Sequence, residues 1–93
     1  MDTQKLTVVA GEKALARLTG RKVVVGVKQL RKALSAGKVF RVYLAENADP
    51  ALTEPFVALC QLNNVEFAWV RSMTDLGHAC GIEVGAAAAA VVT

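Results

Sequence analysis

The chain has 93 residues, which suffices for one domain with one apolar core but not for two. Its 54% apolar content excludes an intrinsically disordered chain, and its two cysteines exclude a disulfide-stapled scaffold. The net charge is only +3, but positions 17–41 hold eight basic residues and no acid, whereas the rest of the chain holds three basic and eight acidic residues. Charge alone leaves two interpretations open, a polyanion-binding surface and a basic surface that is merely solvated.

The first half of the chain predicts a helix, a strand, a second helix and a second strand. Apolar residues near helical spacing predict a helix over 8–18, which Gly20 can end. The β-branched run 23–25 predicts a strand that Gly26 ends. From 27 to 36 the apolar residues fall in one sector of a helix, and Gly37 supplies its stop. Residues 39–45 alternate and predict a strand.

A third helix is predicted to begin at Asp49 and Pro50, because aspartate accepts hydrogen bonds from free N–H groups and proline suits the first helical position. Pro55 lies deep enough to remove a helical hydrogen bond, so we expect either a bend or a new start with Thr53 as the cap. Asn63 and Asn64 end this helix. Its apolar face is expected to consist of Leu52, Phe56, Leu59 and Cys60.

The last third of the chain predicts a strand over 65–70 and then a short helix. Ser72 to Asp75 resembles a capping box, and the helix that follows runs to about Cys80 and ends at Gly81. The run 86–92 is ambiguous, because alanine favours helix whereas the helix–strand alternation and the valines at 91 and 92 favour strand. We predict a closely packed central strand. The expected fold is thus α/β, a three-layer α/β/α sandwich with one mostly four-stranded mixed sheet.

The first candidate site is the turn at Gly26, where a strand passes into a helix whose free N–H groups can face an anion. Neither glycine motif of nucleotide-binding loops is complete there, so we do not expect a nucleotide site. Lys28, Gln29 and Lys32 are spaced to converge on one exposed patch, with Arg31 at its flank. Lysines suit phosphates, and the amide of a glutamine can contact a base edge. On periodicity alone, a solvated amphipathic helix remains the simpler interpretation.

The second candidate site is the loop around Ile82 and Val84. Gly77, Gly81 and Gly85 recur every fourth residue and predict tight turns that could push these two apolar side chains outward. Apolar side chains in such a loop can pack on an unstacked RNA base. From spacing alone, however, Ile82 and Val84 fit the core better.

Catalytic and metal-binding chemistry has little support in this sequence. His78 and Cys80 are two residues apart and do not face each other on a helix, and no third group is evident to orient them. Cys60 falls on an apolar face and is expected in the core. With one histidine, two distant cysteines and no clustered carboxylates, we expect no metal site, no cofactor and no enzymatic activity.

No secretory signal is visible at the N-terminus, which lacks a basic region followed by an apolar one. The longest apolar run, 86–92, is far below the ~18–20 residues of a membrane helix. We therefore expect a cytoplasmic protein without a membrane partner.

Three segments of the chain, 25–32, 45–50 and 76–84, resemble the ribosomal L7Ae/L30e superfamily, and most closely its small bacterial members. The resemblance implies an α/β/α sandwich that binds kink-turns, which are sharply bent RNA motifs with tandem sheared G·A pairs. It also implies a set of RNA-contacting residues: Gly26, Val27, Lys28, Gln29, Arg31, Lys32, Ile82, Glu83 and Val84.

Within that family pattern, Gly26 lets the backbone approach the RNA and Lys32 matches an invariant basic position. Lys28 stands where asparagine is common. Gln29 stands where glutamate is common and can accept one hydrogen bond from guanine through its amide oxygen. The loop 82–84 matches the apolar loop that covers the extruded base, which reverses the core interpretation of Ile82 and Val84.

We therefore expect one RNA-binding domain over 1–93, a non-catalytic monomer that recognises kink-turns, in ribosomal RNA or another RNA, as a ribosomal or ribosome-associated protein. One alternative is a protein-interaction adaptor of the same fold, against which the retention of Gly26, Gln29 and Lys32 counts. The other is a small enzyme or nucleotide-binding domain, which the missing catalytic groups disfavour.

Overall fold

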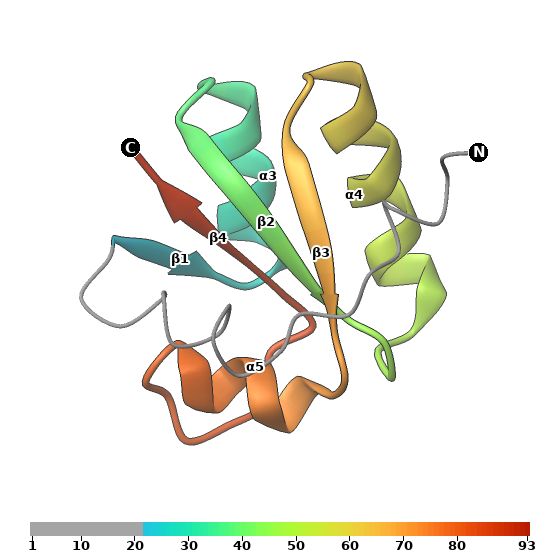
Figure 1. The fold of residues 1–93 in the computed structure, drawn as a ribbon, viewed down its shortest axis with the longest axis vertical. Helices are drawn as coiled ribbons and strands as arrows, with labels where there is room; N and C mark the ends of the chain where they lie inside the picture. Colours follow the sequence, from blue (N-terminus) through green and yellow to red (C-terminus); the bar gives the residue numbers. More distant parts are fainter. Residues whose placement is uncertain (1–21) are drawn as a thin grey trace.

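A four-stranded sheet with helices on both faces forms the part of the protein that the computed structural model describes, residues 22–93 (Figure 1). The helix expected over 8–18 lies outside these residues. The described elements, in chain order, are β1 (Val23–Val25), α3 (Val27–Ser35), β2 (Val39–Ala45), α4 (Pro50–Leu62), β3 (Glu66–Val70), α5 (Met73–Ala79) and β4 (Ala88–Val92).

The strand order in the sheet is β1-β4-β2-β3. β4 runs antiparallel to both of its neighbours, whereas β2 and β3 are parallel, so the sheet is mixed as predicted. The ambiguous alanine run is therefore a central strand, and Ala88, Ala89 and Ala90 are fully buried. Alanine fits this position because a strand covered on both faces needs side chains that let the two layers approach closely.

The two faces of the sheet carry separate apolar clusters, which makes the fold a three-layer sandwich. Val42 and Leu44 of β2 pack with Leu30 of α3 and Phe56 of α4. Tyr43 and Ala45, which alternate with them along the strand, pack with Leu76 of α5 on the other face. The α/β fold with its mixed sheet is thus confirmed.

The predicted cap at Asp49 and the Ser72 half of the predicted capping box are confirmed. The Asp49 carboxylate accepts a hydrogen bond from the Ala51 N–H at 2.9 Å, with Pro50 at the first helical position. The Ser72 hydroxyl accepts one from the Asp75 N–H at 3.1 Å. Each cap satisfies a backbone donor that the helix itself leaves free, which is worth about 1 kcal/mol.

Of the two alternatives expected at Pro55, the restart at Thr53 is wrong, and so is one assignment to the buried face of α4. The helix does not restart at Thr53, because it already begins at Pro50 and continues through Pro55, and Thr53 is buried instead. Leu52 does not share the buried face, since its side chain is 43% exposed, while Phe56 and Cys60 are fully buried and Leu59 is half-buried. The reason is that the packed part of the helix begins one residue later, at Thr53.

The described helices are short. None of them is both long enough and apolar enough to cross a membrane.

Candidate nucleic-acid interface

One edge of the sheet gathers four chain connections. The registers place the carboxyl ends of β1, β2 and β3 beside the amino end of β4, because β4 is antiparallel to β1 and β2. The turn at Gly26 and the loop before β4 therefore lie at the same edge, although more than 50 residues separate them along the chain.

Backbone hydrogen bonds join these connections directly. The Gly26 N–H donates to the Ala88 carbonyl at 3.0 Å, and the Ala45 N–H donates to the Ala87 carbonyl at 2.9 Å. The Glu46 N–H donates to the Val70 carbonyl at 2.8 Å. The sheet thus holds the start of α3 and the end of the 81–87 loop in a fixed relation.

Gly26 adopts a backbone conformation that only glycine tolerates, with φ 104° and ψ 152°. A Cβ atom added here would have no heavy atom within 4 Å, so the backbone at this turn faces open space. No side chain among residues 22–93 caps the start of α3, and the first turn of this helix contains no acid. Its first amide groups are therefore left for water or for an anionic ligand.

The exposed side of α3 has the composition that the sequence predicts. Lys28, Gln29 and Lys32 are exposed, whereas Leu30 and Leu34 are buried against the sheet.

The side chains of Arg31 and Val27, two further predicted RNA-contacting residues of α3, point away from this exposed side. The guanidinium of Arg31 lies 5.7 Å from the centre of the Phe56 ring of α4, so this side chain leans toward the neighbouring helix. Val27 is half-buried in the apolar cluster of α3 and α4, and it offers the edge its backbone rather than its side chain.

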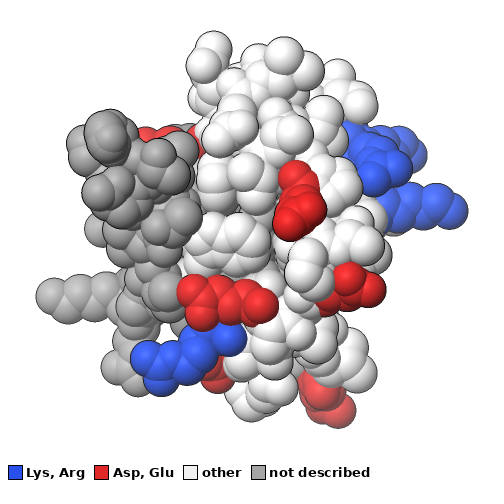
Figure 2. All heavy atoms as spheres, turned by 90° about the vertical axis from the view of Figure 1, so that its right-hand side faces the viewer, with Lys and Arg blue, Asp and Glu red and all other residues white. Residues whose placement is uncertain are grey.

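Basic side chains occupy two places on the surface that Figure 2 shows, which is the side of the molecule where α4 lies. One group of lysine and arginine atoms lies at the right-hand margin of the view, apart from the acidic side chains. A second group lies at the lower left against acidic side chains, and further acidic side chains are scattered over the same face.

The loop between α5 and β4 exposes one of the two predicted apolar side chains. Val84 is 70% exposed and Glu83 is exposed beside it. Ile82 is half-buried and packs against the cluster that contains Tyr43 and Leu76. The spacing-based assignment to the core is therefore wrong for Val84 and right in part for Ile82, whose side chain supports the loop from below.

The glycines at every fourth position hold this loop against α5. Gly81 (φ 81°) ends the helix: its N–H donates to the His78 carbonyl, and the next N–H, of Ile82, donates to the Gly77 carbonyl, both at 3.0 Å. A Cβ atom on Gly77 would lie 2.0 Å from the Val84 carbonyl oxygen, and one on Gly85 would lie 3.0 Å from the Met73 Cβ. The loop and the helix thus approach each other more closely than side chains would permit.

Sequence reasoning missed the role of Asn47. Its side-chain oxygen accepts a hydrogen bond from the Met73 N–H at 2.8 Å, at the start of α5. The Met73 carbonyl in turn accepts one from the Ala86 N–H at 3.0 Å. Asn47 therefore ties the β2–α4 connection to the helix that carries the loop. The available signal was an asparagine in a loop, a residue that often bonds to backbone groups.

The eight basic residues at positions 17–41 do not form one surface in the structure. Lys28, Arg31 and Lys32 lie on α3, while Lys22 and Lys38 line a pocket at the opposite edge of the sheet. Arg41 pairs with Glu66 at 2.6 Å, and this contact is the main cause of the raised pKa of Arg41. The remaining members, Arg17 and Arg21, lie outside the described residues.

The two cysteines and the histidine, which the sequence offers as candidates for catalytic or metal-binding chemistry, lie apart from such roles in the described residues. Burial raises the pKa of the Cys60 thiol to about 11 and also raises the pKa of Cys80, so neither thiol is activated as a nucleophile. His78 is exposed on the surface of α5. Among residues 22–93, no three histidine, cysteine or acidic side chains are close enough to hold a metal ion.

Comparison with known proteins relates the chain to a family. A sequence profile of the ribosomal protein L7Ae/L30e/S12e/Gadd45 family matches residues 8–93. A Bacillus pumilus protein named "RNA-binding protein" is 47% identical over 70 residues, which are 75% of this chain and 85% of that protein. "RNA-binding protein YbxF" of Geobacillus stearothermophilus is 43% identical over 75 residues, 81% of this chain and 92% of that protein.

A solved structure shares the fold at lower sequence identity. The "Giardia lamblia 15.5kD RNA binding protein" superposes with a TM-score of 0.76 over 91% of this chain and 78% of that chain, at 23% identity. This likeness supports the fold and, by itself, no more than the fold.

Proposed function

The chain belongs to the ribosomal protein L7Ae/L30e/S12e/Gadd45 family, and on that basis we propose that it is a non-catalytic RNA-binding protein that recognises kink-turns. The relatives that are named RNA-binding proteins support the first part of this proposal. The sequence resemblance at 25–32 and 76–84 supports the second.

The observation that carries the proposal is the hydrogen bond from the Gly26 N–H to the Ala88 carbonyl, which joins the turn before α3 to the first residue of β4. The elements on either side of this bond bring two kinds of surface to the same end of the sheet: a helix start with exposed Lys28, Gln29 and Lys32, and a loop with exposed Val84. A bent RNA needs both, because its backbone is anionic and its kink leaves a base unstacked.

Each group has a task that follows from its chemistry. The free amides of α3 and the two lysines contact phosphates, which position the RNA without reading its sequence. The amide oxygen of Gln29 accepts a hydrogen bond from a guanine edge. Val84 covers the extruded base, and Ile82 beneath it keeps the loop from collapsing inward.

We further propose that the protein acts as a cytoplasmic monomer on ribosomal RNA or on another RNA that contains a kink-turn. Membership of a family named for ribosomal proteins supports the ribosomal target.

A gel-shift titration tests the proposal with two RNAs, one containing a kink-turn and one in which the G·A pairs are replaced by Watson–Crick pairs. We expect tight binding to the first and binding at least tenfold weaker to the second. Equal affinity for both RNAs would mean that the protein binds RNA through its basic surface alone and does not recognise the kink-turn. The absence of binding to either RNA would favour the protein-interaction adaptor.

A further inference from the structure

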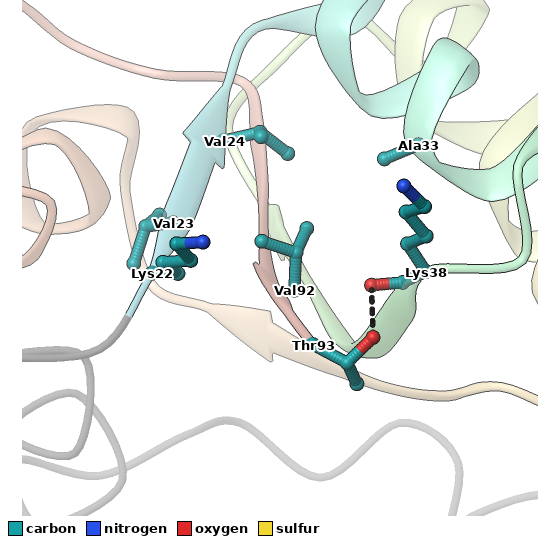
Figure 3. A pocket seen from close by; sticks show the side chains of 7 residues that line it. All are labelled: Lys22, Val23, Val24, Ala33, Lys38, Val92 and Thr93. Carbon is teal, nitrogen blue, oxygen red and sulfur yellow. Dashed lines mark hydrogen bonds between the residues drawn. The ribbon is translucent and has the colours of Figure 1, made fainter.

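A pocket lies at the opposite edge of the sheet from the Gly26 turn. It is formed where β1 and β2 begin and β4 ends, and its volume is about 430 Å³. The floor is apolar and consists of Val23, Val24, Val92 and Ala33 of α3, while Lys22 and Lys38 stand at the rim. Figure 3 shows the two ammonium groups on opposite sides of Val92.

The two lysines have no acidic partner in the described part of the chain. No acidic residue lines the pocket, and Glu66, which begins β3 at the same edge of the sheet, is bonded to Arg41. Two exposed ammonium groups beside one hollow, with no acidic side chain of residues 22–93 in its lining, create a local positive potential. The ligand that complements them is an anion.

The backbone fixes the spacing of these lysines. The Lys22 carbonyl accepts a hydrogen bond from the Val92 N–H at 2.9 Å, and the Lys38 carbonyl accepts one from the Thr93 N–H at 2.8 Å (Figure 3 shows the further bond from the Thr93 hydroxyl, 3.3 Å). Both lysines are thus anchored to the end of β4, so the sheet presents them as one unit.

The helix α3 connects this pocket with the proposed kink-turn surface. It is nine residues long, which corresponds to about 13 Å, a length that a few base-pair steps of an A-form RNA duplex span. Gln29 and Ala33 are one turn apart on the same side of this helix. An RNA stem that is bound at Gln29 and runs along this side of α3 therefore reaches the pocket at Ala33. The distance is less than half a helical turn of the RNA duplex.

We propose that the pocket between Lys22 and Lys38 receives the ribose–phosphate backbone of an RNA arm that flanks the kink, a proposal that rests on the proposed function. The two lysines contact successive phosphates. The apolar floor packs against the carbon face of the ribose between them, which explains why a site for a polyanion is lined by valines. The contact carries no sequence information, since it touches no base.

The test is a salt titration of binding with two kink-turn RNAs. In one the flanking stem extends at least eight base pairs beyond the G·A pairs, and in the other it ends after two. The variant is Lys22→Ala/Lys38→Ala, whose two positions are exposed, so the fold is retained and a thermal melt verifies it. The slope of log affinity against log salt is expected to decrease by about 0.9 for each phosphate that the variant no longer neutralises.

On the long RNA, the variant should show a slope lower by about one to two and an affinity lower by about three- to tenfold at low salt. On the short RNA it should bind as the wild type does. Lys22→Arg/Lys38→Arg should keep wild-type binding to both. The control Ala58→Glu/Gln61→Glu lowers the net charge by the same amount at exposed positions of α4 and should affect both RNAs alike.

Equal reductions of affinity on the two RNAs, or an unchanged affinity on the long one, would overturn the assignment of the pocket. The preference of the wild type for the kinked RNA over its Watson–Crick copy is a separate measurement. Its failure would reject the proposed function, whereas the comparison of long and short stems decides the pocket.

Discussion

The close approach of Gly77 to the Val84 carbonyl makes a prediction about how the loop is held in place. In Gly77→Ala, the new Cβ atom would lie 2.0 Å from the Val84 oxygen and 3.1 Å from its carbonyl carbon. Cβ atoms in proteins essentially never approach other atoms within 3.0 Å, so helix and loop must separate by about 1 Å. The hydrogen bond from the Ile82 N–H to the Gly77 carbonyl, now 3.0 Å, would be strained in the same movement.

The cost follows from two opposing effects. Overpacking of this kind costs about 1–3 kcal/mol, while alanine gains ~0.5–1 kcal/mol over glycine inside a helix. We therefore expect the free energy of unfolding to fall by about 0.5–2 kcal/mol, which lowers the melting temperature by ~2–15 °C in a domain of this size. The displacement moves Val84 relative to α3, so kink-turn affinity should fall by about tenfold or more at a temperature where the variant is folded.

Thermal denaturation and RNA titration at 15 °C measure the two effects. His78→Ala is the matched control, because it changes an exposed residue of the same helix and should alter neither quantity. Val84→Ala should weaken RNA binding while leaving the melting temperature within a few degrees of wild type. The reasoning would be refuted if Gly77→Ala kept both the stability and the affinity of the wild type.

Further predictions concern the binding helix, a helix cap and a buried thiol. Gln29→Ala should cost about 1–3 kcal/mol of binding to a kink-turn RNA and much less on its Watson–Crick copy, and a wild-type affinity would contradict its role. Lys32→Ala should reduce the salt slope by about one on kink-turn RNA, which a salt titration measures. Asp49→Ala should lower the free energy of unfolding by about 1 kcal/mol in urea denaturation, because the Ala51 N–H loses its acceptor. Burial raises the pKa of Cys60 from its usual 9.0 to about 11, so the folded state keeps a proton that the unfolded state releases. The free energy of unfolding should then decrease as pH rises from 9.0 to about 11, and Cys60→Ala should show a shallower decrease over this window.

Most elements of the fold could be predicted because their signals are local. The caps at Asp49 and Ser72 and the helix end at Gly81 act within a few residues of one another, and the structure confirms them. The strand predicted over 39–45 has the same bounds in the structure, where its last four residues are all buried because both faces of the sheet are covered there. The predicted ends of helix α3 and strand β3 differ from the observed ones by one residue, since element ends depend on single hydrogen bonds.

The errors arise where packing overrides the local pattern. Leu52 follows the helical period of the buried face, yet it stays exposed because the packed part of α4 begins at Thr53. Pro55 does not reset the helix start, because the cap at Asp49 already stabilises a turn before it. Ile82 and Val84 are both apolar and lie in the same glycine-rich segment, so the sequence does not distinguish them. Only the fold of the loop decides that Ile82 packs inward and that Val84 faces solvent.

At the Gly26 turn, the local sequence determines some features of the candidate site and the tertiary structure determines others. The sequence alone determined that a strand passes into an amphipathic helix there and that Lys28, Gln29 and Lys32 share its exposed side, because these properties depend on neighbouring residues and a period of 3.6. The tertiary structure decided that the loop with Val84 and that turn lie at the same end of the sheet, and that Lys22 and Lys38 line one pocket at the other end. Both juxtapositions depend on β4 pairing antiparallel between β1 and β2, a long-range pairing whose energy comes from the whole buried sheet and leaves no periodic trace in the chain.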